Sequence, residues 1–327
     1  MSFAKGLEFV ARSQLKRYRP VARTSESIPI KGETLRTNVY AGGDRGTIIV
    51  VHGMALRGIE DPRMEVLGQS LASLGFTVYA PHFSEIANLV ISTESWRKVS
   101  QVVRFVSEKV GGRVALFSAS FSAGIVLVAA CGEEKNRISA VCTVGTLGSV
   151  DTTLDFLMGQ QGIDDYGTMV VLWNFLKVPE PVRDAFRTAA EDNGLMREAP
   201  QLPDKLAKLK KADLELFNKL RHDRDFRLAE WRKFTATKQF QDLRANCSPS
   251  LHMKPVPFKV VLIHGEEDNV IPPSESISLH KEFLARGVSS RLGITPLISH
   301  GHGSIGLAAI PEAVKLASAF GEFIAAV

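Results

Sequence analysis

The segment Thr47 to Val51 (TIIVV) constrains the fold more than any other, because it is an uninterrupted apolar, β-branched run that ends at His52-Gly53. Such a run is typical of a strand buried on both faces, as in a parallel sheet. Similar short runs follow, with helical stripes between most of them: Phe76 to Ala80, Val114 to Phe117, Ile138 to Val144 and Lys259 to His264. Alternating strands and helices indicate right-handed crossovers. The sequence therefore predicts an α/β fold with a mostly parallel central sheet and helices on both faces.

Further elements complete this alternation. Two short strands are predicted within Ser25 to Tyr40, around the turn Lys31-Gly32, and a last strand over Arg291 to Ile298. A closing helix has Pro311 in its first turn. The other predicted helices follow the apolar stripes: Leu67 to Leu74, Glu94 to Val110, Ser122 to Ala130 and Ser274 to Ala285.

The alternation lapses from about Asp151 to about Pro255. This stretch contains no convincing strand, and its helical segments are Thr168 to Leu176, Pro181 to Glu191, Lys205 to Leu220 and Phe226 to Phe240. A chain of 327 residues also exceeds the usual size of one domain. We therefore predict a core made of residues 1–150 and 255–327, interrupted by a helical insertion over residues 151–254.

The segment VALFSASFSAGIVLVAA predicts a sharp bend, because a buried strand runs directly into a buried helix. A turn this tight places Ser120 in a strained backbone conformation, with its hydroxyl above the carboxyl edge of the sheet. The residues two before and two after must be small, a need that Ser118 and Ser122 meet, and Gly124 gives further room. The helix N-terminus also favours negative charge near Ser120.

This bend resembles the nucleophile elbow of the α/β-hydrolase family, whose usual form is G-x-S-x-G. The sequence departs from that form, because Ser118 and Ser122 replace both glycines. The resemblance extends from about Thr47 to the C-terminus, apart from the insertion, and it implies that Ser120 is a catalytic nucleophile.

Three other segments resemble segments of the family and occur in the same order along the chain. The first two are the oxyanion-hole loop and the acid loop. VVHGMALRG resembles the oxyanion-hole loop, which makes the backbone N–H of Met54 one donor and that of Phe121 the second. VVLIHGEEDNVIPP resembles the acid loop, with Asp268 as the triad acid and Glu266 and Glu267 as fallbacks.

The general base is expected on the loop after the last strand, in ITPLISHGHGSIG. The PLISH context favours His300, and the GHG context favours His302 as the alternative base. We prefer His300. In either case the order along the chain is Ser, Asp, His.

In the resembled family an insertion before the acid strand forms a helical cap that shapes the pocket and excludes water. Here it supplies apolar candidates for the pocket lining: Leu154, Phe156, Leu157, Met158, Met169, Val170, Val171, Leu172 and Phe175. Such a lining suits a small, hydrophobic ester as substrate. No metal and no organic cofactor is implied.

Composition limits the other partners. The net charge of +5 comes without a run of like charges, so we expect no nucleic-acid partner. The basic residues between Lys205 and Lys233 alternate with acidic ones, as on a solvated helical face. Three cysteines, Cys131, Cys142 and Cys247, are too few for a disulfide framework and suit a reducing compartment as buried free thiols. The sequence leaves a homodimer open.

The first 20 residues predict an amphipathic helix rather than a secretory signal, because Lys5, Glu8 and Arg12 interrupt the apolar residues. Phe3, Leu7, Val10 and Ala11 recur at helical spacing. We expect this helix to dock onto the main domain, and peripheral membrane contact is the alternative. No segment approaches the roughly 18 apolar residues of a membrane span, so we expect a cytoplasmic protein.

Together these features predict a carboxylesterase-like serine hydrolase that acts through a Ser-His-Asp catalytic triad and an acyl-enzyme. The alternative is a catalytically silent α/β-hydrolase fold that binds a ligand or a protein, because the glycines of the elbow are missing.

Overall fold

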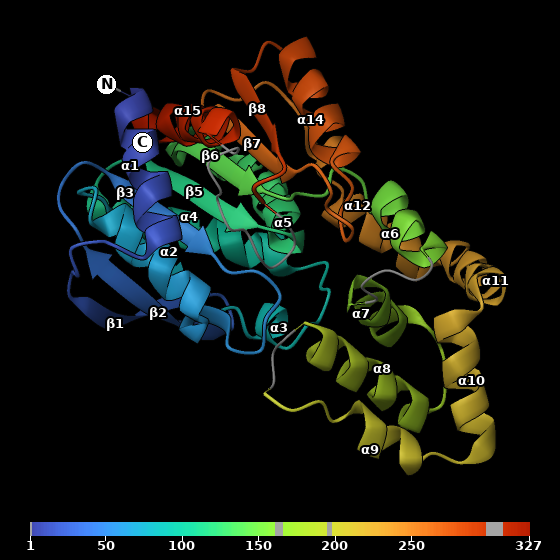
Figure 1. The fold of residues 1–327 in the computed structure, drawn as a ribbon. Coiled ribbons are helices and arrows are strands. Elements are labelled where there is room, and N and C mark those ends of the chain that lie inside the picture. The colour runs from blue at the N-terminus through green and yellow to red at the C-terminus, as the bar shows by residue number, and fades with distance from the viewer. Residues whose placement is uncertain (1, 161–165, 195–197, 299–309) are drawn as a thin grey trace.

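The computed structural model of the chain describes residues 2–160, 166–194, 198–298 and 310–327 (Figure 1). An eight-stranded sheet in the order β1-β2-β4-β3-β5-β6-β7-β8 crosses its centre. β1 and β2 form an antiparallel hairpin that joins β4, and all pairings from β4 to β8 are parallel. The strands are β1 (Arg23–Ile30), β2 (Glu33–Ala41), β3 (Thr47–Val51), β4 (Thr77–Pro81), β5 (Val114–Ala119), β6 (Ile138–Val144), β7 (Lys259–Gly265) and β8 (Ser290–Thr295). The predicted mostly parallel sheet is confirmed.

Helices cover both faces of this sheet, as the alternation predicts. α1, α2 and α15 pack on one face, while α4, α5 and α14 pack on the other. The helices of the core are α1 (Ser2–Leu15), α2 (Pro62–Ala72), α3 (Ser84–Ala87), α4 (Ser95–Val110), α5 (Phe121–Ala130), α14 (Ser274–Ala285) and α15 (Ile310–Ala326). Short 3₁₀ turns lie at Gly58–Glu60 and Glu133–Arg137.

The continuous apolar runs arise from this double cover. In β3, Ile48 and Val50 face the cluster under α2 and α15, whereas Ile49 and Val51 face the cluster under α4 and α5. Successive strand residues point to opposite faces, so a strand covered on both sides needs apolar residues at every position.

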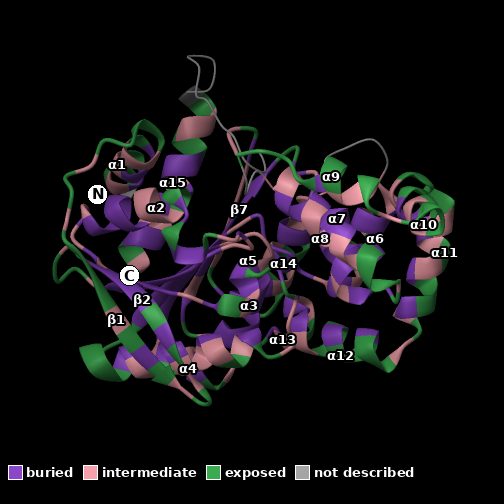
Figure 2. Cartoon of the chain, turned by 90° about the horizontal axis from the view of Figure 1, so that it is seen from below, coloured by how far each residue is buried: buried purple, intermediate pink, exposed green. Residues whose placement is uncertain are grey.

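Between β6 and β7 the chain forms a separate group of helices, which we call the insertion (Val150–His252). Its helices are α6 (Val150–Gly159), α7 (Tyr166–Phe175), α8 (Glu180–Asn193), α9 (Leu202–Ala207), α10 (Lys211–His222), α11 (Arg224–Thr235), α12 (Lys238–Cys247) and α13 (Pro249–His252). Figure 2 shows buried residues at its centre as well as around the sheet. The insertion has its own cluster of buried apolar residues. The predicted lining residues, apart from the half-buried Phe156, are buried in this cluster, where they pack the insertion itself.

Helix boundaries in the insertion differ from the sequence prediction. The helix predicted over Lys205 to Leu220 is divided into α9 and α10, and the one predicted over Phe226 to Phe240 into α11 and α12. At the second break Thr237 has extended backbone, and its hydroxyl accepts a hydrogen bond from the N–H of Phe240. The apolar periodicity continues through such a break, which hides it in the sequence.

The N-terminal helix α1 packs against α15, as expected. Its buried face matches the predicted stripe only at Val10, however, because Gly6 and Phe9 are buried with it while Phe3, Leu7 and Ala11 are exposed. Gly6 permits the close approach, since a Cβ there would lie 1.8 Å from the carbonyl oxygen of Ala317. Among the residues that the structure describes, no helix has both the length and the apolar composition needed to cross a membrane.

Candidate active site

The topology of the sheet singles out one place on its edge. The chain passes from β3 to β4 on one side and later returns to β5 on the other side of β3. Ligands of open α/β sheets bind outside the carboxyl ends of the strands at such a reversal. Two predicted site segments follow these strands, namely 52–54 after β3 and 120–121 after β5.

Ser120 forms the sharp bend between β5 and α5, with φ of 61° and ψ of −146°. This conformation costs a residue with a side chain about 1–3 kcal/mol. Neighbouring structure holds it in place, because the Ser120 N–H donates to the carbonyl of Val144 (2.8 Å) and its carbonyl accepts from the N–H of Ala123 (3.0 Å). The strand, bend and helix predicted around Ser120 are therefore present.

The serines that replace the elbow glycines fit without opening the bend. Ser118 donates its hydroxyl to the carbonyl of Val51 at 2.9 Å, which links β5 to β3. Ser122 is buried in the first turn of α5, and its Oγ has no hydrogen-bond partner among the described residues. Gly124 is needed for space, since a Cβ there would lie 2.8 Å from Leu147 Cγ.

His52 shapes the loop after β3, a role that the sequence analysis did not assign. Its Nε2 accepts from the N–H of Phe83 (3.1 Å), so Nδ1 carries the hydrogen and donates to the carbonyl of Gly53 (2.9 Å). Burial lowers the pKa of His52 to about 4, and the ring stacks on that of His82. A neutral imidazole therefore ties this loop to the segment after β4. The signal in the sequence is a histidine directly after a fully buried strand.

The two predicted oxyanion residues lie close to the bend. A Cβ on Gly53 would lie 3.8 Å from the carbonyl oxygen of Ala119, so the two loops run side by side. Phe121 is the first residue of α5, where an N–H has no acceptor within its helix. Met54 and Phe121 are half-buried and contact both the sheet cluster and the insertion cluster.

Tyr166, at the start of α7, reaches this loop from the insertion. Its hydroxyl donates to the carbonyl oxygen of Met54 at 2.9 Å. The contact fixes the peptide that follows Met54 and sets the loop geometry from the insertion side. No pattern in the sequence relates these two residues, because 112 positions separate them.

Asp268 lies just past β7 and is buried, whereas Glu266 and Glu267 are exposed. Its Oδ1 accepts from the backbone N–H groups of Val270 (2.9 Å) and Ile271 (3.0 Å). These hydrogen bonds hold the carboxylate in one orientation, which makes Asp268 the carboxylate of this loop suited to orient a histidine.

His264, the residue before the last position of β7, supports the acid loop from below and was not assigned a role from the sequence. Its side chain is fully buried, with Nε2 2.8 Å from the carbonyl of Ile271 and Nδ1 2.6 Å from Ser276 Oγ. Nε2 therefore carries a hydrogen, which it donates to the carbonyl of Ile271. The same Nε2 lies 3.5 Å from Oδ2 of Asp268.

β6 connects the bend to the acid loop. Val144 accepts from the N–H of Ser120, and the next residue, Gly145, donates to the carbonyl of Ile263 (2.8 Å). Gly145 has a φ of 63°, and a Cβ there would lie 3.2 Å from Oδ2 of Asp268. The Asp268 carboxylate thus lies over the end of β6, the strand that separates it from Ser120.

The two candidate bases, His300 and His302, lie outside the described residues. The chain before them is placed beside the acid loop, because a Cβ on Gly265 would lie 2.1 Å from the carbonyl oxygen of Ile298. The N–H of Glu266 also donates to the carbonyl of Thr295 at 3.0 Å.

The insertion also contacts the acid loop. Gln160 donates its side-chain amide to the carbonyl of Asn269 (2.6 Å), next to Asp268, and Gly167 packs against Val270. At the base of the insertion, Glu275 accepts from the N–H groups of Gly148 and Ser149, both at 2.8 Å. The acid loop, through Gln160, and the loop after β3, through Tyr166, are therefore both in contact with the insertion.

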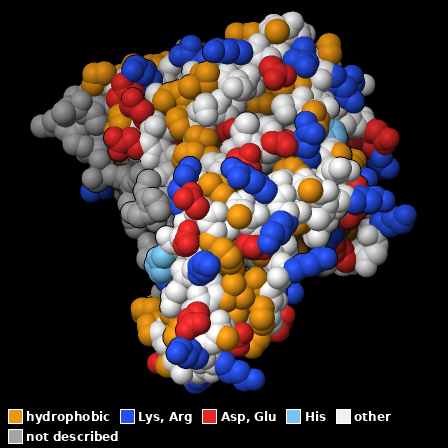
Figure 3. All heavy atoms as spheres, turned by 90° about the vertical axis from the view of Figure 1, so that its right-hand side faces the viewer, with side chains coloured by type: hydrophobic (Ala, Val, Ile, Leu, Met, Phe, Trp, Pro, Cys, Tyr) orange, Lys and Arg blue, Asp and Glu red, His pale blue; other side chains and the backbone are white. Residues whose placement is uncertain are grey.

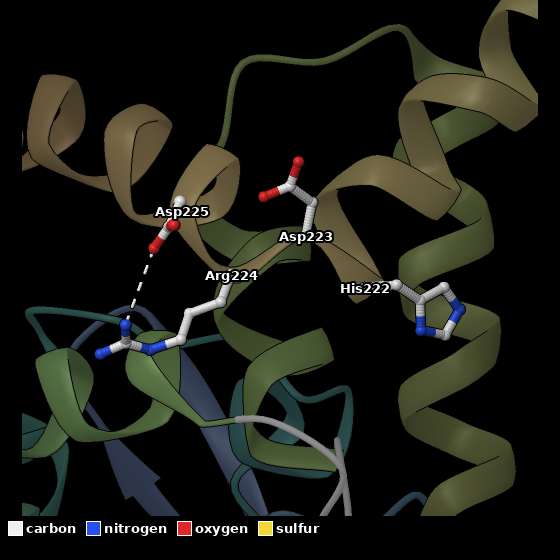
Figure 4. A pocket seen from close by; sticks show the side chains of 4 residues that line it. All are labelled: His222, Asp223, Arg224 and Asp225. Atoms are coloured by element: carbon white, nitrogen blue, oxygen red, sulfur yellow. Dashed lines mark ion pairs between the residues drawn. The ribbon is translucent and has the colours of Figure 1, made fainter.

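A hollow of about 440 Å³ lies elsewhere, where α10 meets α11 (Figure 4). Its lining residues are consecutive, from His222 to Asp225, and Figure 4 shows His222 pointing away from the others. Asp223 caps α11 by accepting from the N–H of Phe226, and Arg224 donates to the carbonyl of Gly159. These side chains hold helix ends together and do not converge on a ligand position.

The outer face of the insertion mixes charges. Figure 3 shows Lys and Arg side by side with Asp and Glu on this end of the molecule. Pairs between Lys205 and Asp184 (3.0 Å) and between Lys233 and Glu230 (2.6 Å) are examples. The basic stretch from Lys205 to Lys233 is therefore a mixed-charge helical surface, as expected from its sequence.

Comparison with known proteins supports the fold. The chain has the α/β-hydrolase fold, and solved esterases and a peptidase of low sequence identity are similar to it in structure. A hyperthermophilic esterase from Pyrobaculum calidifontis is similar with a TM-score of 0.54 and 12% identity, over 98% of this chain and 91% of the esterase. An arylesterase structure gives 0.54 and 11%, over 98% and 88%.

The acylaminoacyl peptidase of Pyrococcus horikoshii is similar with a TM-score of 0.54 and 13% identity, over 93% of this chain. This chain spans only 40% of the peptidase's length. No family model matches the sequence, and no curated protein matches it. The similarity is thus one of fold, at identities too low to carry over an activity.

Proposed function

We propose that this protein is a serine hydrolase that cleaves carboxylic esters, with Ser120 as the nucleophile. The observation that carries the proposal is the backbone of Ser120, a strained bend between a buried strand and a buried helix at the reversal point of the sheet. Strain at a bend is retained where surrounding structure enforces it, and such residues cluster at active sites.

In the proposed reaction the Ser120 oxygen attacks the ester carbonyl carbon while a histidine, His300 or else His302, takes the hydroxyl proton. Asp268 orients that histidine and stabilises its charged form. The N–H groups of Met54 and Phe121 donate to the developing oxyanion. The histidine then gives its proton to the departing alkoxide, and water releases the acid from the acyl-enzyme in a second, equivalent step.

The substrate proposal rests on where Met54 and Phe121 lie. Both are half-buried apolar side chains at the contact between the sheet core and the insertion. An acyl group bound to Ser120 would meet this apolar junction, so we propose a hydrophobic acyl chain and a cap role for the insertion.

The test compares p-nitrophenyl acetate, butyrate and octanoate with an acylamino-acid p-nitroanilide. We expect ester turnover, with kcat/KM rising with acyl length, and little amide cleavage. Amide cleavage at equal or higher kcat/KM would replace the esterase proposal by a peptidase. Ser120→Ala should abolish this turnover, and its matched control is Ser122→Ala, which removes a buried hydroxyl two residues from the nucleophile and should leave turnover unchanged. Absence of turnover in every assay would favour the silent fold.

A further inference from the structure

The outward face of α1 carries no charged residue, and all of its residues except Gln14 are apolar. Viewed along the helix, the exposed positions are Phe3, Ala4, Leu7, Ala11, Gln14 and Leu15. The three large side chains are 42% (Phe3), 45% (Leu7) and 63% (Leu15) exposed. The helix is already docked by its opposite face, where Phe9 meets Phe320 with ring centroids 4.7 Å apart. The exposed stripe is therefore not needed to hold α1 on the core.

The net positive charge of the chain lies in its first 23 residues, of which Arg23 is in β1 and pairs with Glu60 and Glu65. Residues 1–23 hold six basic residues and one acidic residue, a net charge of +5 that equals the net charge of the whole chain. The rest of the chain is balanced. Lys5 and Arg12 share Glu8 at one flank of the stripe, and the exposed Arg17 and Arg19 follow directly after the helix.

We infer that α1 binds the surface of an anionic lipid bilayer, with Phe3, Leu7 and Leu15 in the interface and the basic residues at the headgroups. An apolar face on a helix with basic neighbours is the pattern of interfacial helices. Basic residues near the helix add attraction to anionic lipids, which salt screens.

A second copy of the chain fits this surface less well. Across a two-fold axis the same positively charged segment meets its own copy, so two segments of net positive charge would be brought together. A bilayer with negative headgroups offers the opposite charge at the rim of an apolar layer.

The position of α1 leaves the candidate active site accessible. In Figure 1 α1 lies at one end of the molecule, against α15 and α2, and the insertion lies at the other end. A bilayer bound by α1 would therefore not cover Ser120, and binding and hydrolysis can be measured separately.

The experiment is sedimentation of the full chain with vesicles of phosphatidylcholine containing 30% phosphatidylglycerol (roughly the anionic fraction that gives polybasic segments a strong surface potential), compared with pure phosphatidylcholine. We expect binding to the anionic vesicles that weakens with added NaCl. Phe3→Gln with Leu7→Gln should reduce the partition coefficient about tenfold or more, because both side chains lose their apolar burial. Replacing Lys16, Arg17 and Arg19 by Gln should abolish the preference for anionic lipid.

The matched control is Leu251→Gln with Leu284→Gln, which changes two leucines that are 55% and 51% exposed away from α1. It should bind like the wild type, and far-UV circular dichroism should show all variants folded.

Equal binding by the Phe3/Leu7 variant and the wild type, or no binding by the wild type at low salt, would overturn the inference. A dimer without lipid that this variant abolishes would assign the stripe to a second copy instead. Turnover of a short soluble ester should be equal in all variants. Vesicle binding is measured without an ester, so failure of the esterase proposal does not affect this test.

Discussion

The bend at Ser120 and the acid loop at Asp268 lie on strands separated only by β6, yet they are held in different ways. The bend carries backbone strain, enforced by a buried strand and a buried helix. The acid loop carries a buried carboxylate that accepts hydrogen bonds from two backbone N–H groups, and His264 holds the loop itself by a hydrogen bond to the carbonyl of Ile271. Packing therefore positions the proposed nucleophile, whereas hydrogen bonds position the proposed acid. Changes at the two places should therefore affect activity alike and stability differently.

Ser120→Ala and Ser120→Gly test the strained bend and should have the largest effect on activity. Both should lower kcat by at least about 10⁴-fold, because the attacking hydroxyl is gone. Only glycine adopts φ of 61° without strain, so Ser120→Gly should raise the free energy of unfolding by about 1 kcal/mol over Ser120→Ala. Urea denaturation measures this difference. Equal stabilities would show that the bend stores no strain.

Asp268→Asn and Asp268→Ala test the hydrogen-bonded side. Asparagine keeps an oxygen for the N–H groups of Val270 and Ile271 but cannot stabilise a charged histidine, so kcat should fall by about 10⁴-fold with the fold retained. Alanine leaves both N–H groups buried without an acceptor, which should cost a further 2–4 kcal/mol or so in unfolding free energy. Activity near wild type in Asp268→Asn would remove Asp268 from the triad and return attention to Glu266 and Glu267.

The pH dependence of stability tests the neutral histidine beside the bend. His52 has an ordinary pKa of 6.5 that burial lowers to about 4 in the folded chain, so below pH 6.5 the unfolded chain binds more protons. Stability should therefore fall between pH 6.5 and pH 4, by about 3 kcal/mol from this group. His52→Gln can make both hydrogen bonds without titrating and should flatten that slope. An unchanged slope would show that burial does not lower the pKa of His52 in the folded protein.

Tyr166→Phe should have the smallest effect. It removes the hydrogen bond to the carbonyl of Met54, a net loss of about 0.5–1.5 kcal/mol, so kcat/KM should fall roughly threefold to tenfold. Tyr40→Phe is the control, because Tyr40 donates to Glu65 at 2.9 Å away from the site. Both variants should lose similar stability, and only Tyr166→Phe should lose activity. Equal activity in Tyr166→Phe and Tyr40→Phe would show that the hydrogen bond to Met54 contributes to stability and not to activity.

The sequence predicts the sheet well because each buried strand is a short, local apolar signal. Thr47–Val51 and Ile138–Val144 have the predicted bounds, and the bend follows from the direct passage of β5 into α5. The insertion is harder, because its apolar period runs through breaks such as Thr237. The buried face of α1 is set by Gly6, which the search for large apolar residues passes over.

The supporting residues of the site were not predicted, for a related reason. His52 and His264 act through hydrogen bonds to backbone groups of other segments, namely the N–H of Phe83 and the carbonyl of Ile271. Tyr166 contacts Met54, which is 112 positions away in the sequence. Sequence patterns report periodicity and motif spacing, whereas these contacts depend on the tertiary structure.

Reaction with a fluorophosphonate probe, followed by mass spectrometry of the digested chain, tests the central claim most directly. The probe forms a covalent bond with a serine oxygen only where that serine is activated as a nucleophile. We expect one adduct, on the peptide that contains Ser120, and none in Ser120→Ala. An unlabelled wild-type chain, or an adduct on another serine, would contradict it.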